Sequence, residues 1–534
     1  MKQYFEAKEQ YKDTLLFFRM GDFFELFYDD AITASKTLDI ALTKRGKGAD
    51  GYEIPMCGVP AHSYESYLHK LINAGFKVAI CDQLESPEEA KKRGYKEIVR
   101  REVVRVVTPG TLTEESLLKP AAPNYLAAIS QQSGEFGLAW ADISTGQFYT
   151  QNLSANQIKA ELARINPSEL VVPENLFYHE NLSKNFADYK QKLTPQPNNI
   201  FEFNRAEKAV KGFYKVISLE GFGALSKPQI SASGALLEYL QLTQNAGNSL
   251  AFPKNYATSH YVAIDADARQ SLDLQQLFKA INKTCTSAGA RLLYSAISAP
   301  LAFAEGVNSR LNATEFFVGS QQTLAQTREV LATLPDLERS FTRIAYNRGE
   351  VRDMLAIKAA LAGALELKNI LQNQALPPFL AEQVAGLNVP ASLLNQLVDA
   401  FKDNAAVSVR DGNFIRAGFD ANLDTLINIR DHSRRLIDDL KNQYAASTGI
   451  PNLKIIYNNM LGYFIEVTAQ NAKKLPESFI HRQTMANAMR FSTPELAEIQ
   501  TKILTAAADA LKIEQQIFAD IAAQIVASAD SILQ

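Results

Sequence analysis

The densest basic stretch of the sequence runs from Lys91 to Arg105 and holds seven lysines and arginines against two acidic residues. Ammonium and guanidinium groups at this density can neutralise the phosphates of a nucleic acid, which supplies affinity without reading sequence. A solvated surface is the more usual interpretation of such a run. The chain as a whole has a net charge of −3, so any contact with nucleic acid must be local.

Two further residues could support catalysis, Asp142 and Cys81. Metal-dependent phosphodiester cleavage of the ribonuclease-H type needs several converging carboxylates, and Asp142 is the one acid found on a suitable strand. A nuclease therefore stays an alternative that magnesium-dependent cleavage of duplex DNA would support. Cys81 lies in KVAICDQ, which is typical of a buried strand, and has no histidine in a catalytic context.

The three cysteines are too few and too scattered for a disulfide framework, and six dispersed histidines make no zinc spacing with them. We expect Cys57, Cys81 and Cys285 to be buried thiols. No catalytic residue and no metal site are predicted for this chain.

Length and composition indicate a folded protein of several domains. The 534 residues are 46% hydrophobic and 21% charged, and three to five domains are expected from the usual domain size of roughly 100–200 residues. No apolar run approaches the roughly 20 residues of a membrane span, and the polar N-terminus does not resemble a signal peptide, so a cytoplasmic location is the default.

The first elements that position these residues form a small α/β domain. Strands are predicted at 15–20, 77–83 and 102–110, with a helix near 63–74. Gly21-Asp22 is expected to turn the chain into a helix over about 23–40. Asp22 is a good N-cap for that helix, and Glu25 falls at the capping-box position three residues later.

A second α/β unit follows, and beyond it the sequence becomes helical. Strands are expected at 125–130, 136–144, 148–153 and 169–173, with helices around 204–245 and a boundary at 245–255. Helical periodicity continues from 265 to 400 and into a long helix at 419–444. A β-rich insertion at 454–490 separates it from a final helix at 495–533, which lacks a stop signal, so we expect a truncation.

Five segments of the first domain resemble, in order and spacing, the mismatch-binding domain of the MutS family: RMGDFFELFYDDA (19–31), LTKRG (42–46), IPMCGVPAHS (54–63), KVAICDQ (77–83) and VVRVVTPGT (103–111). The resemblance continues through LAWADISTGQF (138–148), DLERSFTRIA (336–345), LGYFIEVT (461–468) and RQTMANAMRF (482–491). It covers nearly the whole chain.

The resemblance implies a multidomain fold of α/β plus α class. It comprises a small mixed α/β mismatch-binding domain (1–112), a ribonuclease-H-like connector (122–248), core and lever helices (256–435), a β-rich clamp (436–494) and a returning lever helix (495–534).

In this family the first residue of the Phe-x-Glu motif, here Phe23, wedges into the minor groove and stacks on a mispaired base. A wedge must unstack a base step, which costs least where pairing is already broken. The resemblance implies that Glu25 hydrogen-bonds the displaced base. The middle residue is usually Tyr, and Phe24 here is expected to serve packing.

The resemblance also implies contacts with the DNA backbone. Lys44, Arg45 and Arg105 are candidates in the first domain, and Lys473, Arg482 and Asn487 in the clamp. Many relatives carry a Lys just before that Asn, where this chain has Ala486, so we expect one phosphate contact fewer. A further departure is NKTCTSAGARLL (282–293), where Asn282 and Ala288 replace Asp and Met; this segment is expected to join helices.

Full-length members carry an ATPase domain that dimerises and binds ATP and magnesium. The sequence has no G-x-x-x-x-G-K-[ST] loop, so we expect this chain not to be an ATPase. Expected partners are mismatched or looped duplex DNA, a second copy in the full-length form, and a MutL-type repair protein, in a bacterial cytoplasm and on the nucleoid. A relative that binds DNA junctions or partner proteins is the alternative, although such relatives tend to lack the Phe-x-Glu motif.

Overall fold

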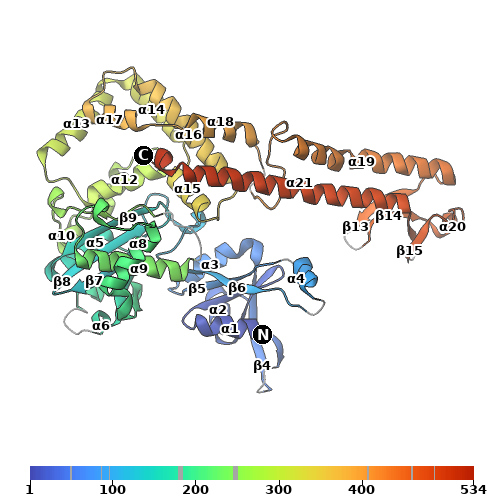
Figure 1. Ribbon diagram of the computed structural model, residues 1–534, viewed down its shortest axis with the longest axis horizontal. Coiled ribbons are helices and arrows are strands. Elements are labelled where there is room, and N and C mark those ends of the chain that lie inside the picture. The colour runs from blue at the N-terminus through green and yellow to red at the C-terminus, as the bar shows by residue number, and fades with distance from the viewer. Residues whose placement is uncertain are drawn as a thin grey trace. The chain divides into compact units, whose positions relative to one another are not determined.

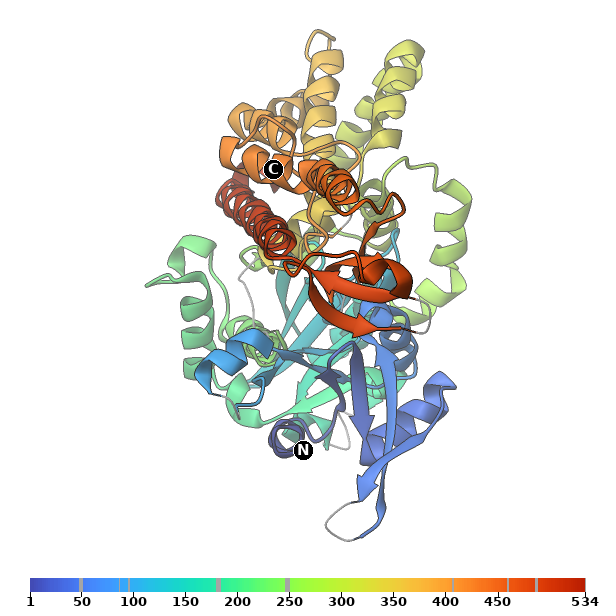
Figure 2. The same cartoon turned by 90° about the vertical axis from the view of Figure 1, so that its right-hand side faces the viewer.

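The computed structural model describes residues 1–47, 51–85, 87–94, 97–178, 184–244, 250–405, 408–458, 461–485 and 488–533. They divide into two compact units (Figures 1 and 2). Unit 1 comprises residues 1–349, 359–389 and 533–534, and unit 2 comprises residues 350–358 and 390–532. None of the helices in the described ranges combines the length and apolar character that crossing a membrane requires.

Unit 1 begins with a six-stranded mixed sheet in the order β3-β4-β2-β1-β5-β6. Strand β1 pairs with β5 in parallel, and the other neighbours pair antiparallel. Helices α2 and α3 contribute buried side chains to the core on one face, and α1 contributes Tyr4 to the core on the other. The elements are α1 (Lys2–Gln10), β1 (Leu15–Met20), β2 (Phe23–Phe27), α2 (Tyr28–Leu38), β3 (Thr43–Lys47), β4 (Glu53–Pro60), α3 (Tyr64–Asn73), β5 (Val78–Gln83), α4 (Pro87–Arg93) and β6 (Arg101–Val107).

The predicted helix over 23–40 is wrong at its beginning, because residues 23–27 form strand β2 and the helix begins at Tyr28. Gly21 and Asp22 form a two-residue hairpin loop, with Gly21 at φ +61° and Met20 opposite Phe23. Glycine at the first loop position is typical of a type II′ hairpin turn. Asp22 therefore belongs to a turn instead of a helix cap, and Glu25 lies in a strand.

The second sheet of unit 1 has the order β11-β10-β7-β8-β9-β12. Strands β7, β8 and β9 form successive antiparallel hairpins, and β10, β11 and β12 add in parallel. Helix α9 packs so closely on β8 that a Cβ at Gly137 would lie 2.0 Å from the Pro228 carbonyl oxygen. The elements are β7 (Tyr125–Gln132), β8 (Glu135–Asp142), β9 (Gln147–Leu153), α5 (Ile158–Ile165), β10 (Glu169–Pro173), α6 (Glu174–Phe177), β11 (Leu193–Gln196), α8 (Phe203–Tyr214), α9 (Lys227–Thr243) and β12 (Lys254–Asn255).

A buried carboxylate joins the two sheets. Glu169, at the start of β10, is 2% exposed and accepts hydrogen bonds from groups of both α/β domains. Its partners are the amide of Gly110 at 3.2 Å, the hydroxyls of Thr108, Thr194 (2.7 Å) and Tyr239 (2.6 Å), and the ammonium of Lys77 at 3.2 Å. A Cβ at Gly110 would lie 2.8 Å from the Glu169 Cβ, so the close approach requires glycine.

The remainder of unit 1 is helical, as predicted. Its helices are α10 (Ala266–Ser271), α11 (Leu274–Ile281), α12 (Ser287–Ser298), α13 (Ala304–Gly319), α14 (Gln321–Thr333), α15 (Leu337–Ala345) and α17 (Pro378–Gly386). Helix α16 (Val351–Leu371) continues from unit 2 into unit 1. The segment 282–286 joins α11 to α12, as expected: the Asn282 side chain accepts from Thr284, and the Thr286 hydroxyl caps α12.

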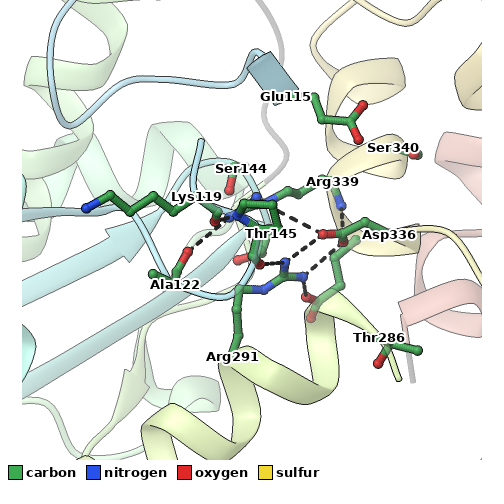
Figure 3. Close-up of polar contacts among 12 residues, drawn as sticks. Glu115, Lys119, Ala122, Ser144, Thr145, Thr286, Arg291, Asp336, Arg339 and Ser340 are labelled. Carbon is green, nitrogen blue, oxygen red and sulfur yellow. Dashed lines mark hydrogen bonds and ion pairs between the residues drawn. The ribbon is translucent and has the colours of Figure 1, made fainter. Parts of the chain in front are cut away.

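An arginine cluster ties this helical part to the segment between the two sheets (Figure 3). Arg291 donates two hydrogen bonds to Asp336, at 2.6 and 2.9 Å, and one to Glu338 at 2.7 Å. It also reaches the carbonyl of Pro120 at 3.2 Å, and Arg339 reaches the carbonyls of Lys119 and Ala122 at 3.1 Å. This cluster was not predicted; its signal in the sequence is two acids and two arginines spaced within DLERSFTRIA.

Unit 2 contains two long helices that lie side by side, with a four-stranded antiparallel sheet at one end (Figure 1). The sheet has the order β13-β14-β16-β15 and packs Ile465 and Phe491 against helix residues such as Tyr444. The sequence predicted both helices and the β-rich insertion. Helix α19 continues without a break across residues 435 and 436, between which the start of the clamp was predicted. The elements are α18 (Ala391–Ala400), α19 (Ala421–Thr448), β13 (Lys454–Asn458), β14 (Gly462–Val467), α20 (Ala469–Ala472), β15 (Ile480–Thr484), β16 (Met489–Ser492), α21 (Pro494–Ala527) and α22 (Ala529–Leu533).

Candidate nucleic-acid interface

Phe23 is an exposed aromatic at the end of the β1–β2 hairpin. It is 47% exposed and lies opposite Met20 on one side and Pro60 on the other. Backbone pairing with two strands fixes its position, so its ring can stay in solvent without loosening the strand. The hairpin therefore presents an aromatic ring on a rigid support.

Glu25 lies on the same face of β2 as Phe23, because side chains alternate along a strand. Its carboxylate oxygen Oε2 accepts an ion-paired hydrogen bond from Nη1 of Arg45, on β3. The Arg45 guanidinium also lies 5.8 Å from the centre of the Phe27 ring on β2. Phe23, Glu25 and Arg45 thus share one surface of the first sheet.

The intervening residue Phe24 points into the core. It is buried, and its ring lies 5.8 Å from that of Phe17 and 5.2 Å from that of Tyr64, measured between ring centres. Its predicted packing role is confirmed. The exposed ring of Phe23 and the buried ring of Phe24 therefore lie on opposite faces of β2.

The three basic residues predicted beside the motif differ in accessibility. Arg45 and Lys44 are exposed, and the Lys44 ammonium pairs with Glu53 on the neighbouring strand β4. Arg105 is 7% exposed and forms an ion pair with Glu114, which is also buried. Its prediction as a phosphate contact is wrong, since the guanidinium already has a buried carboxylate partner and faces the interior.

Some basic side chains of the run Lys91–Arg105 form ion pairs and hydrogen bonds within the domain. Arg93 pairs with Glu85 and, at 3.1 Å, with Glu97. Arg101 is partly buried and donates to the carbonyl of Arg19 at 2.6 Å and to that of Val99 at 2.9 Å. Structural roles therefore account for a share of this charge.

In unit 2 the small sheet and its connecting helix carry the predicted clamp residues. Lys473, directly after α20, and Arg482 in β15 are both exposed. The register of β15 against β16 shifts between His481 and Gln483, so Arg482 lies at an irregularity in the strand pairing. Asn487 and Ala486 lie outside the described residues.

Arg490, also on this sheet, has a structural role. Its guanidinium lies 3.2 Å from Glu466, donates to Gln483 at 2.9 Å and covers the Phe464 ring at 4.5 Å. Arg482, in contrast, is exposed.

The residues considered for catalysis are occupied in structural roles. The buried Asp142 carboxylate accepts hydrogen bonds from Asn124 N at 3.0 Å and from Ser144 N and Oγ at 2.9 and 2.6 Å. The described ranges contain no group of three or more His, Cys, Asp or Glu placed to hold a metal ion. Cys57 and Cys81 are buried as predicted, and burial raises the pKa of the Cys57 thiol to about 11. Cys285 is only half-buried, so that prediction is wrong.

Two α/β domains followed by helices that carry an inserted sheet define a multidomain protein of α/β plus α class. Family models match it throughout: MutS domain I at residues 1–116, MutS domain II at 124–254 and MutS domain III at 238–534. The chain is 42% identical to the DNA mismatch repair protein MutS of Wolbachia pipientis wMel, covering 100% of this chain and 67% of that protein. It is 43% identical to the protein of the same name from Ruegeria pomeroyi, covering 99% of this chain and 62% of the relative. The chain belongs to the MutS family of DNA mismatch repair proteins.

Proposed function

We propose that this chain recognises mismatched or unpaired bases in duplex DNA, with Phe23 as the wedge and Glu25 as the hydrogen-bond acceptor. The observation that carries the proposal is the exposed Phe23 ring at a rigid hairpin, with Glu25 on the same strand face. A wedge between base steps costs a few kcal/mol of unstacking, and least where pairing is broken. A mismatch is then recognised as a deformable step instead of a sequence.

Glu25 adds discrimination because a carboxylate near phosphates is repelled unless a base donates a hydrogen bond to it. A displaced base exposes the donors of its pairing edge, which a paired base uses for its own partner. In the matched complex the carboxylate stays without a donor, so Glu25 destabilises the matched complex more than the mismatched one. The preference therefore arises from disfavouring the wrong ligand.

The remaining parts supply grip and support in this proposal. Arg45 and Lys44 contact the backbone near the wedge, and the clamp residues Lys473, Arg482 and Asn487 contact it as well; we propose that the small sheet of unit 2 belongs to this clamp. The antiparallel hairpins with parallel additions in the second sheet support a ribonuclease-H-like connector. The long helices α19 and α21 act as levers.

Nucleotide hydrolysis is assigned to a part of the relatives outside the region matched here, since the chain spans 67% and 62% of their lengths and has no phosphate-loop motif. ATP and magnesium would bind there. We also propose that the full-length protein pairs with a second copy and with a MutL-type protein. It would act on DNA in the bacterial cytoplasm.

Binding of a duplex with one G·T mismatch or one unpaired base, against its matched control, tests this function. Wild type should prefer the mismatched duplex, and Phe23→Ala should abolish the preference. Phe5→Ala is the matched control, because Phe5 is also an exposed phenylalanine, 50% accessible, on α1 of the same domain. Equal affinity of wild type for both duplexes would end the proposal and favour a junction-binding or partner-binding relative.

A further inference from the structure

We propose that Arg45 is a positioning residue for mismatch discrimination, which acts through Glu25 by holding one carboxylate oxygen and leaving the other for the base. This inference rests on the proposed function and concerns the same surface. It assigns to Arg45 a role in specificity, beyond the contribution to affinity that a backbone contact would make.

The contact between the two residues joins neighbouring parts of one sheet. Glu25 lies on β2 and Arg45 on β3, and strand β4 lies between them in the strand order. Opposite Glu25 on β4 stands Gly58, which has no side chain to separate the two. A Cβ added at Gly58 would lie 3.8 Å from the Glu25 Cγ and 3.8 Å from the Phe23 ring. The missing side chain thus leaves the space above β4 open, and Arg45 reaches across it.

The hydrogen bond uses Nη1 of Arg45 and Oε2 of Glu25. A carboxylate has two oxygens and about four acceptor sites, so a single donor leaves Oε1 with capacity for another donor. The guanidinium fixes the carboxylate, and the Phe27 ring, whose centre lies 5.8 Å from the guanidinium carbon, contributes a cation–π contact to Arg45. In this arrangement one side chain, Arg45, holds a second side chain, Glu25, in the orientation in which it can accept a hydrogen bond from a DNA base.

Charge gives the pair a second effect. Glu25 is 18% exposed at its side chain and would approach the phosphates as an unpaired anion if Arg45 were absent. With Arg45 beside it the pair is neutral as it nears the DNA, so the carboxylate reaches the base at a lower electrostatic cost. Loss of Arg45 should therefore weaken both complexes through repulsion and the mismatched complex additionally through lost orientation, and only the second effect lowers the preference for mismatched duplex.

A double-mutant cycle separates this role from a simple phosphate contact. The measured quantity is the ratio of the Kd for matched duplex to the Kd for mismatched duplex, in the 534-residue chain, for wild type, Arg45→Met, Glu25→Gln and the double variant. We expect Arg45→Met to lower the ratio by about threefold or more in the wild-type background and to leave it unchanged in the Glu25→Gln background, because contacting residues couple and independent ones do not.

Two companion variants control the experiment. Lys44→Met removes the neighbouring charge on β3, whose partner is Glu53, and should weaken both duplexes equally. Arg45→Lys keeps one charged donor within reach of Glu25 and should restore most of the ratio. Thermal melting of each variant checks that the hairpin still folds.

The outcomes are distinguishable. If wild type discriminates but Arg45→Met weakens matched and mismatched duplex by the same factor, Arg45 is a phosphate contact only and the inference is overturned. A fall in the ratio of equal size in the Glu25→Gln background would overturn it too, since the effect would not pass through Glu25. If wild type itself shows no preference, the proposed function fails first.

Discussion

The ammonium of Lys77 lies 3.2 Å from the buried carboxylate of Glu169, and this ion pair joins the first α/β domain to the second. Burial alone would raise the pKa of Glu169. The charge of Lys77 and the hydrogen bonds from Thr108, Tyr239 and Thr194 outweigh it, and the pKa lies below its ordinary value. Glu169 is therefore expected to be ionised at neutral pH.

A depressed carboxylate pKa stabilises the fold above the unfolded pKa of about 4.3 and loses that contribution as pH falls through the folded pKa. We predict that Glu169→Gln is less stable than wild type at pH 7 and that the difference shrinks as the pH falls below about 4. Urea unfolding followed by Trp140, the single tryptophan and buried in the second sheet, measures it. A difference that stays constant with pH would contradict the assignment. Lys36→Met, on the exposed face of α2, is the control.

Arg291 should hold the segment between the two sheets in place. We predict that Arg291→Lys, which cannot donate in the same forked geometry to Asp336 and Glu338, lowers the free energy of unfolding by about 2 kcal/mol. It should also speed cleavage by a glutamate-specific protease after the exposed Glu115, in the same segment, whose Lys119 carbonyl Arg339 holds. Mass spectrometry of the fragments measures the rate. The exposed Arg310→Lys serves for comparison, and equal cleavage of the two variants would refute the prediction.

The turn before Phe23 depends on glycine. Gly21 has φ +61°, and no atom lies within 4 Å of a Cβ built there, so Gly21→Ala costs backbone strain alone. We expect a loss of about 1 kcal/mol in the free energy of unfolding and a reduced preference for mismatched duplex. Gly212→Ala, in helix α8 with equally open space, should instead stabilise by about 0.5–1 kcal/mol. If both variants lowered the free energy of unfolding, or both raised it, the turn geometry at Gly21 would be contradicted.

Arg482 and Arg490 should separate grip from folding in the small sheet of unit 2. Arg482→Ala is predicted to weaken matched and mismatched duplex alike and to reduce the salt slope of binding by about 1. Arg490→Met should leave that slope unchanged and cost about 1 kcal/mol through its contacts with Glu466 and Phe464. Faster amide exchange in β14 and β16 would reveal that loss. A changed mismatch preference in Arg482→Ala would argue against a backbone contact.

The sequence predicted most strands and helices, because their apolar residues follow the periods of the two structures. It failed at Phe23 to Phe27. There the local signals of Asp22 and Glu25 favoured a helix, whereas the pairing partners of β2 come from two other segments of the chain. Backbone pairing with β4 is a long-range effect that no local pattern reveals, whereas the pairing with β1 has a local signal, the Gly21-Asp22 loop between two apolar runs, which was interpreted as a helix start.

The site was predicted in part for a similar reason. The family resemblance identified Phe23, Glu25 and Arg45, but neither the motif nor the spacing indicated that Arg45 contacts Glu25. Arg105 was misassigned because a basic residue in a basic run looks exposed, and its acidic partner Glu114 is nine residues away. The DNA-contacting roles of the exposed residues stay predictions.

The alternation along β2 has a consequence for genetics. Phe24 and Leu26 are both buried, so replacing either should cause misfolding and a low level of the protein in the cell. Replacing Phe23 should leave the protein abundant and folded but unable to distinguish mismatched from matched duplex. Two neighbouring codons would then give different classes of repair-deficient allele. One class would be rescued by low temperature or chaperones, and the other would respond only to restoration of the aromatic ring.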